Sequence, residues 1–280
     1  MSSKPNYHLN ADDISQELDE ISKRLVAARS NAEALHEFPG ELPATLADAY
    51  AVQSASIARW PDEIMGWKVG MVPGEFRSSL QAERLAGPIF KSSIFEAEAG
   101  SSNRMHIYSG GFAAVEAEFV LKLATTIQPV EREYSDEELV DLVADLHVAA
   151  EIASSPMAFV NKLGPCCVVS DFGNNAGLLV GPSVPEWRSL PPEELHTEVI
   201  VDGEAVGTAS ASAIAGGLLQ PLRFLVALCA ERGMTLAEGT YVSTGAVTGI
   251  HDVTVESKAT VDFGPHGAFD VAFEAMQSRQ

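Results

Sequence analysis

Two glutamates lie two residues apart in the otherwise apolar segment AAVEAEFVLKL. In a strand, Glu116 and Glu118 would lie on one face about 7 Å apart, while Val115, Ala117 and Phe119 would fill the other face. Two carboxylates on a partly buried strand repel each other and are costly to desolvate unless a cation lies between them. A hard divalent ion such as Mg²⁺ would supply that charge. A solvated strand face on an acidic protein is the alternative.

A third glutamate and a lysine share this character. In HVAAEIA, Glu151 projects from a strand pattern that is otherwise apolar. If the three glutamates converge, about three octahedral positions remain for water and substrate, as in a Lewis-acid site. In GWKVG, Lys68 faces away from Trp67 and Val69. An enclosed lysine can move protons or balance an anionic substrate, whereas a surface lysine is the ordinary alternative.

The overall charge limits the partners of the protein. The 280 residues carry 18 Lys and Arg against 39 Asp and Glu, a formal net charge of −21. An exterior this acidic repels phosphate, which argues against nucleic acid and anionic membranes as partners. The three cysteines form no C-x-x-C spacing, and no signal peptide, membrane helix or nucleotide-binding glycine motif is evident. We therefore expect a cytoplasmic protein without disulfides.

The elements that must position these residues change in character along the chain. Residues 1–64 predict a helical N-terminal region, with Asp12 or Asp13 capping a first helix and Pro43 in the first turn of a second. Residues 65–280 predict a β-rich catalytic domain that forms one continuous unit with it, in the α+β class. Strands are expected in nine segments: GWKVGM, VEAEFVLKL, HVAAEIA, CCVVS, GLLVG, TEVIVDGEAVG, TYVSTG, KATVDFG and FDVAFE.

Only two helices are expected among these strands. One begins at Ser135, where Glu138 completes a capping box, and directs Leu139, Leu142, Val143 and Leu146 inward. The other runs from Pro221 to Gly233.

The order GWKVG, GFAAVEAEFVL, HVAAEI, PLRFLVALCAERGMTLAEGTYVSTG and VDFGPHG resembles the 2-keto-4-pentenoate hydratase and 4-oxalocrotonate decarboxylase group of the fumarylacetoacetate hydrolase superfamily. The resemblance extends from about Tyr50 to Phe273. It implies a mixed β-roll domain of fumarylacetoacetate hydrolase C-terminal-domain type. It also implies Mg²⁺ or Mn²⁺ as cofactor, a homo-oligomer, and the following roles: Glu116, Glu118 and Glu151 as metal ligands, and Lys68 as the active-site lysine.

The resemblance further implies a lyase of aromatic catabolism. It would hydrate an anionic 2-hydroxy-2,4-dienoate to a 4-hydroxy-2-oxoacid by way of an enolate. A 4-oxalocrotonate-type decarboxylase needs the same enolate, so the ligands do not separate the two. One alternative is an acylpyruvate C–C hydrolase, in which His36 with Glu37 or Glu41 would be the base that activates water. Another is a non-catalytic subunit in a hetero-complex with a related chain.

The resemblance also extends to the surroundings of the metal ligands. It implies that Ser243, Thr244 and Gly245 lie close to the substrate, where an amide and the hydroxyl of the Thr244–Gly245 pair would bond an oxyanion. A plain strand-end turn is the alternative. The segment DFGNN, which begins at Asp171 and ends at Asn175, is expected to line the cavity, and a tight turn that needs left-handed conformations is the alternative.

The chain departs from the group in the segments that recognise the substrate. After Glu151, the sequence continues Ile152-Ala153-Ser154-Ser155-Pro156, where relatives carry E-I-x-D-S-R. Arg77 and Arg84 are the nearest cations for a second substrate carboxylate. The departures predict an altered substrate shell around a retained metal site.

Overall fold

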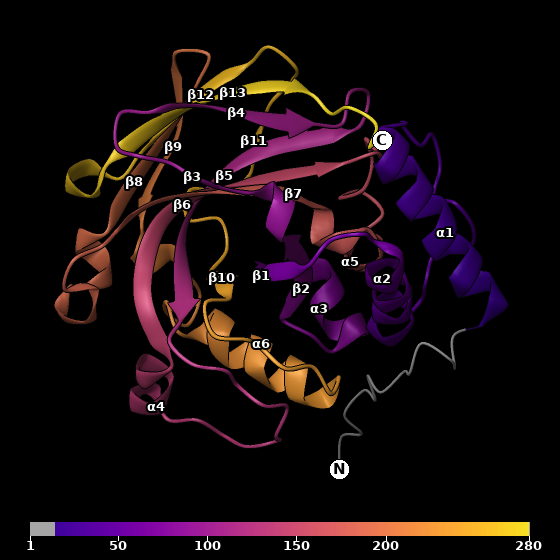
Figure 1. The fold of residues 1–280 in the computed structure, drawn as a ribbon, viewed down its shortest axis with the longest axis horizontal. Coiled ribbons are helices and arrows are strands. Elements are labelled where there is room, and N and C mark those ends of the chain that lie inside the picture. Colours follow the sequence, from indigo (N-terminus) through magenta and orange to yellow (C-terminus); the bar gives the residue numbers. More distant parts are fainter. Residues whose placement is uncertain (1–14, 280) are drawn as a thin grey trace.

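The computed structural model describes residues 15–279, and its elements are ordered along the chain as Figure 1 shows. The helices are α1 (Gln16–Asn31), α2 (Leu46–Arg59), α3 (Gly74–Leu80), α4 (Asp136–Asp141), α5 (Pro165–Ser170) and α6 (Gln220–Glu231). The strands are β1 (Ile64–Met71), β2 (Arg84–Phe90), β3 (Ile94–Glu96), β4 (Ser102–Ile107), β5 (Phe112–Leu123), β6 (Val143–Ser155), β7 (Asn175–Ser183), β8 (His196–Val201), β9 (Glu204–Ser210), β10 (Tyr241–Ser243), β11 (His251–Asp252), β12 (Lys258–Asp262) and β13 (Ala268–Ala275).

The strands form two mixed sheets. The larger sheet has the order β2-β1-β10-β5-β6-β7-β3, with β11 paired to β5. The smaller sheet has the order β4-β13-β12-β8-β9 and lies at the upper left in Figure 1. Strands β5 and β6 are the longest and are antiparallel neighbours at the centre of the larger sheet. This pair is therefore the rigid support on which a site can be built.

The alternation of β5 divides its side chains between two environments. Val115, Ala117 and Phe119 belong to the main apolar core, where the Phe119 ring lies 5.6 Å, between centroids, from that of Phe263, which directly follows β12 of the smaller sheet. Burial of this face stabilises the two-sheet packing. The opposite face of β5 carries Glu116 and Glu118, as the period of two requires.

The first two helices pack against the β-rich part through a small second core. Ile21 and Leu25 of α1 meet Val52 of α2 and Met157, which follows β6. The first helix is capped by the Ser15 hydroxyl, which accepts from Leu18 N–H. The predicted cap at Asp12 or Asp13 lies outside the described residues. The domain boundary at residue 64 stays a prediction.

Several predicted elements were wrong in detail. CCVVS is not a strand but the short helix α5, because Gly164 ends the preceding segment and Pro165 occupies the first helical turn. The helix after Ser135 keeps its capping box but ends at Asp141, because Val143 and Leu146 belong to β6. Helix α2 begins after the cap Thr45, so Pro43 precedes its first turn.

The late helix α6 agrees with its predicted span to within two residues at each end. Among residues 15–279, no helix combines the length and the apolar character needed to cross a membrane.

Candidate metal and substrate site

The fold brings the three predicted glutamates together. Glu116 and Glu118 lie on β5, and Glu151 of β6 is the direct cross-strand partner of Glu116. Each contributes one carboxylate oxygen to a group whose members all lie within 4.8 Å of one another. The three residues are 5%, 0% and 0% exposed, respectively. The strand register alone therefore places three buried carboxylates around one point.

Glu118 is held by one of its oxygens and leaves the other without a partner. Its Oε2 accepts a short hydrogen bond from the Ser243 hydroxyl and a longer one, 3.4 Å, from Gly245 N–H. Its Oε1 is buried and has no hydrogen-bond partner among residues 15–279. Buried hydrogen-bond acceptors almost always have a partner, so the partner of this oxygen is expected to come from a bound ion or ligand.

Glu151 repeats this arrangement from the neighbouring strand. Its Oε1 accepts from the Asn175 side-chain amide at 2.9 Å and lies 3.2 Å from Lys68 Nζ. Its Oε2 is buried and has no hydrogen-bond partner in the part of the chain that the structure describes. Two of the three glutamates thus present one oxygen that is fixed and one that is free.

The electrostatics of the cluster are unbalanced. Burial raises the pKa of Glu116 to about 7, with repulsion from Glu151 adding to the effect and Lys68 opposing it. Burial, together with Glu151 and Glu116, raises the pKa of Glu118 well above its usual value. A divalent cation would balance this excess of carboxylate, and an all-oxygen donor set is the one that Mg²⁺ and Mn²⁺ prefer. The residues present therefore fit the predicted metal ion.

Lys68 projects from β1 into the same space and is 7% exposed. Burial alone would lower its pKa, but the attraction of Glu151, Glu116 and Glu118 outweighs burial and raises it. Lys68 is therefore a fixed ammonium at neutral pH. Room for its side chain comes from Gly173, where a Cβ would lie 3.2 Å from Lys68 Cδ. Gly87, the partner of Lys68 on β2, lets the Phe172–Gly173 backbone pack against the strand, since a Cβ there would lie 2.3 Å from the Phe172 carbonyl oxygen.

A cavity of about 380 Å³ opens onto this cluster. Lys68 and Glu116 line its polar part, and Arg84 lies on its wall with its guanidinium bonded to the Ala215 carbonyl. Most further lining residues are apolar or small, among them Leu85, Val168, Ile214, Thr244 and Gly245, while Asn161 and Asn174 add polar side chains. The exposed side chains of Met71 and Ile250 also line the cavity. The volume suits a small organic acid.

Thr244 and Ser243 serve this site differently from the prediction. Both Thr244 donors are bound to Phe119, whose carbonyl accepts from the hydroxyl at 2.7 Å and from the amide at 3.2 Å. Neither Thr244 donor is therefore left for a substrate oxyanion. Thr244 and Gly245 do line the cavity, and an oxyanion contact by the Gly245 amide stays a prediction. Ser243 does not line it, because its hydroxyl holds Glu118.

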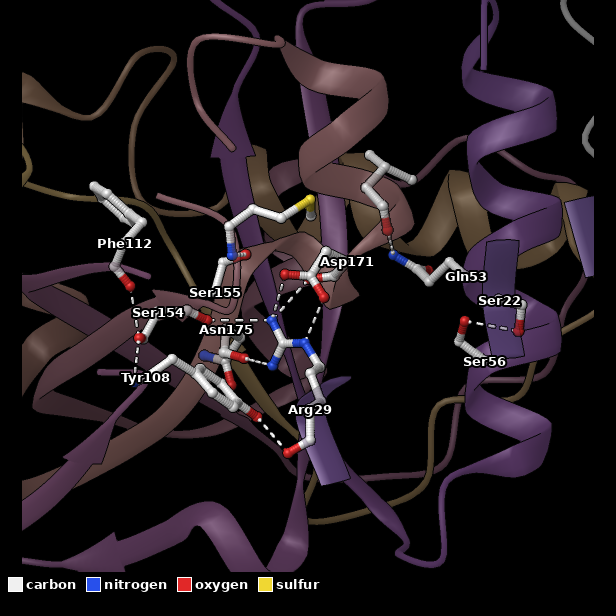
Figure 2. Close-up of polar contacts among 12 residues, drawn as sticks. Ser22, Arg29, Gln53, Ser56, Tyr108, Phe112, Ser154, Ser155, Asp171 and Asn175 are labelled. Atoms are coloured by element: carbon white, nitrogen blue, oxygen red, sulfur yellow. Dashed lines mark hydrogen bonds and ion pairs between the residues drawn. The ribbon is translucent and has the colours of Figure 1, made fainter. Parts of the chain in front are cut away.

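Asp171 does not line the cavity, contrary to the prediction. Its carboxylate is bound by Arg29 of α1 through two hydrogen bonds of 2.5 and 2.9 Å (Figure 2). Arg77 lies outside the cavity as well, since its Nε donates to Val72 O. His36 is exposed and does not line the cavity, and its role as the base of the hydrolase alternative stays a prediction.

Asn175 ends the segment DFGNN that the resemblance places near the cavity, but its contact with Glu151 was not predicted. It lies at the first position of β7 and reaches Glu151 on β6. A strand-initial asparagine is usually part of a turn, so its type gave no indication of a contact with a metal ligand.

Comparison with known proteins gives a likeness in structure but none in sequence. No family model matches the chain, and no curated protein matches it. Two structures of 4-oxalocrotonate decarboxylase from Pseudomonas putida G7, one with calcium and acetate and one with magnesium and adipate, superpose with a TM-score of 0.74 at 20% identity. The match covers 92% of this chain and 97% of theirs.

More distant likenesses point to the same fold. A fumarylpyruvate hydrolase from Pseudomonas aeruginosa, in complex with Mn²⁺ and pyruvate, has a TM-score of 0.56 at 13% identity over 78% of this chain and 91% of its own. A 2-hydroxyhepta-2,4-diene-1,7-dioate isomerase from Mycobacterium marinum has a TM-score of 0.53 at 14% identity over 76% and 77%. The likenesses confirm the predicted α+β fold, a helical N-terminal part followed by a mixed β-roll domain of fumarylacetoacetate hydrolase C-terminal-domain type.

Proposed function

We propose that this chain is a divalent-metal-dependent lyase that hydrates a small 2-hydroxy-2,4-dienoate to a 4-hydroxy-2-oxoacid through an enolate. The observation that carries the proposal is the cluster of Glu116, Glu118 and Glu151 beside Lys68, at a cavity of organic-acid size. The structural neighbours that carry Mg²⁺, Ca²⁺ or Mn²⁺ together with small carboxylates support it.

The three glutamates would hold Mg²⁺ or Mn²⁺. When bound, such an ion polarises the 2-oxygen of an oxoacid and stabilises the negative charge of its enolate. The neighbouring Lys68 ammonium would bind the substrate carboxylate and can supply a proton during tautomerisation. Conjugate addition of water then places the hydroxyl on C4 and a proton on C3, so no other reactant is required.

Arg84 bears on the choice of substrate. Its guanidinium lies on the cavity wall and is bonded to a main-chain carbonyl, Ala215 O. A second carboxylate at the far end of the substrate would give this cation a charged partner. Because that pairing stabilises the carboxylate, it favours a reaction that retains the group. Hydration of a dienedioate fits this requirement.

Decarboxylation of a 4-oxalocrotonate-type diacid is the second candidate. The apolar side chains of Leu85, Val168 and Ile214 also line the cavity. A carboxylate placed against them would be poorly solvated, which favours its loss as CO₂. The two candidates therefore differ in which part of the wall receives the distal group.

The test is turnover of a panel of mono- and dicarboxylic 2-hydroxydienoates by the Mn²⁺-loaded chain, with the products analysed by mass spectrometry. A gain of one water identifies the hydratase, and release of one CO₂ per turnover identifies the decarboxylase. Glu116→Gln should lower turnover by about 10³-fold or more, because the metal contributes several kcal/mol to the barrier. Glu204→Gln, on the exposed strand β9, is the matched control and should retain activity.

Two results would count against the proposal. Full activity of Glu116→Gln would remove the metal site from the reaction. A chain that binds Mn²⁺ and turns over none of the panel would favour the non-catalytic subunit of a hetero-complex.

A further inference from the structure

The contacts around Asn175 extend the metal site beyond its three ligands. Asn175 is 4% exposed, and its side-chain amide donates to Glu151 Oε1 at 2.9 Å. Glu151 has two oxygens, and the amide occupies the one that also faces Lys68. The second oxygen is the one left without a partner. The amide therefore selects which oxygen Glu151 presents to an ion.

A second set of contacts fixes Asn175 itself. Arg29, from α1, donates through NH1 to the Asn175 carbonyl at 2.9 Å and through NH2 to the Ser154 carbonyl at 3.2 Å. Figure 2 shows these bonds spreading from one guanidinium toward the end of β6, which carries Ser154, and the start of β7, which carries Asn175. The same guanidinium is bound by Asp171. Arg29 therefore bonds to both β6, which carries Glu151, and β7, which carries the amide partner of Glu151.

The surroundings leave Arg29 a single arrangement. Its guanidinium carbon lies 5.3 Å from the ring centroids of both Tyr108 and Phe172. Tyr108 also bonds back to α1, donating its hydroxyl to the Arg29 carbonyl at 3.4 Å. A planar, buried, bidentate guanidinium of this kind is pre-organised and loses little freedom on bonding. It can therefore hold two strand ends at a constant distance.

We propose that Asn175 is a positioning residue for the metal ligand Glu151, and that Arg29 acts on the metal site by holding Asn175. The inference rests on the proposed function, since it assumes an ion at the three glutamates. Helix α1 would then support the metal site through Arg29, although none of the three proposed ligands lies on α1. Hydrogen-bond partners of metal ligands commonly change metal affinity by 10- to 100-fold when removed.

The test is Mn²⁺ binding by the full chain, followed by electron paramagnetic resonance. Asn175→Ala and Asn175→Leu both remove the amide donor, and the leucine keeps most of the side-chain volume. Each should raise the Kd for Mn²⁺ about 10- to 100-fold and change the bound Mn²⁺ spectrum. Folding should survive, because Arg29 bonds the main-chain carbonyl of residue 175, which every residue supplies. Asn103→Ala, on β4, removes a side-chain amide elsewhere and should leave the Kd unchanged.

Arg29 is tested by a double-mutant cycle. Arg29→Lys keeps the charge for Asp171 but loses the fork that reaches Asn175, so it should raise the Kd for Mn²⁺ several-fold. If Arg29 acts through the Asn175 amide, the same change in an Asn175→Ala background should raise the Kd no further. A purely structural arginine would give independent, additive effects, and that result would overturn the role of Arg29.

The controls separate the failure of this inference from the failure of the proposed function. If wild-type protein and Glu116→Gln bind Mn²⁺ equally, there is no site at the glutamates and the proposed function fails. If the wild type binds Mn²⁺ tightly, Glu116→Gln does not, and both Asn175 variants bind like the wild type with the wild-type spectrum, only the present inference fails.

Discussion

Two buried clusters of charge lie beside each other in this molecule, and only one of them is balanced. In the first, Arg29 and Asp171 form a two-pronged ion pair between side chains that are 4% and 0% exposed. In the second, three buried glutamates face the ammonium of Lys68, and two of their carboxylate oxygens have no hydrogen-bond partner within residues 15–279. Asn175 contacts both clusters.

The difference separates a structural charge from a binding site. A buried pair whose donors and acceptors are all matched needs nothing further, and it holds segments together. A buried cluster with surplus carboxylate is unfavourable until a cation arrives, so its stability depends on a ligand. A variant that leaves a charge of the first cluster unpaired should therefore lose stability, and a cation bound to the second cluster should increase stability.

The largest effect is expected from unbalancing the first cluster. Arg29→Met leaves the Asp171 carboxylate buried without a charge partner, which should lower the free energy of unfolding by about 3–5 kcal/mol. Urea denaturation at pH 7 measures this loss. Arg24→Met, on the exposed face of the same helix, should change it by about 0.5 kcal/mol or less. An equally small effect of Arg29→Met would show that the pair is dispensable.

The next effect comes from balancing the second cluster with its ion. Mn²⁺ at 100 times its Kd should raise the free energy of unfolding by about 2.7 kcal/mol. Glu118→Gln should remove most of this gain, while the metal-free variant should be no less stable than the metal-free wild type. The reason is that the substitution removes a carboxylate whose charge is unfavourable in the metal-free site, where burial and the neighbouring Glu151 and Glu116 raise the pKa of Glu118 well above its usual value. Thermal unfolding with Mn²⁺ and with a chelator provides the measurement.

A comparable gain in Glu118→Gln and in the wild type would contradict this account. Glu198→Gln, on β8, is the control because it lies outside both clusters and should keep the full response to Mn²⁺.

The pH dependence of the metal-free protein should show the same imbalance. Glu116 has an ordinary pKa of 4.5 and a folded-state pKa of about 7, so the folded protein binds more protons between these values. The free energy of unfolding should therefore fall as pH rises from about 4.5 to 7. Mn²⁺ affinity should rise over the same range, because binding releases the proton. Glu116→Gln should flatten both slopes relative to the wild type, and unchanged slopes would exclude Glu116 as the titrating group.

The unbalanced cluster was open to prediction because its signal is local. Alternation in VEAEFVLKL and HVAAEIA gives the strands and the face on which each glutamate lies. The convergence then follows once β5 and β6 pair, with Glu116 opposite Glu151. A charged residue at a position with apolar neighbours is conspicuous in any sequence.

The balanced cluster has no such signal. Arg29 and Asp171 are 142 positions apart, and Arg29 and Asn175 are 146 apart. Arginine on an amphipathic helix ordinarily faces solvent, so nothing near Arg29 indicates burial. Long-range polar contacts depend on how the helices dock, and this cannot be inferred from periodicity. Strand β2 was missed for a local reason, because Gly87 and Pro88 interrupt its strand pattern.

The prediction of a short element was wrong for a different reason. CCVVS has the β-branched, apolar character of a strand, yet it folds as helix α5. For a run of five residues, periodicity does not distinguish the two, and the turn residues on either side decide. Here Gly164 and Pro165 outweigh the composition of the segment.

The smallest expected effect concerns Arg84, a buried arginine that resembles Arg29 in type but not in partner. Arg84 is 5% exposed and bonds the Ala215 carbonyl, whereas Arg29 is matched by Asp171. If the substrate brings the missing carboxylate, Arg84→Met should raise KM for a dienedioate about tenfold, which corresponds to about 1.4 kcal/mol, and leave KM for a monocarboxylic dienoate unchanged.

Steady-state kinetics with the two substrates tests this difference directly. Arg84→Lys should fall between the wild type and Arg84→Met, because lysine keeps the charge but loses the planar pair of donors. Equal losses for both substrates would mean that Arg84 shapes the cavity and does not recognise a carboxylate. In that case Arg84 would belong with the Arg29 cluster as a structural charge, and the distal end of the substrate would meet only the apolar wall.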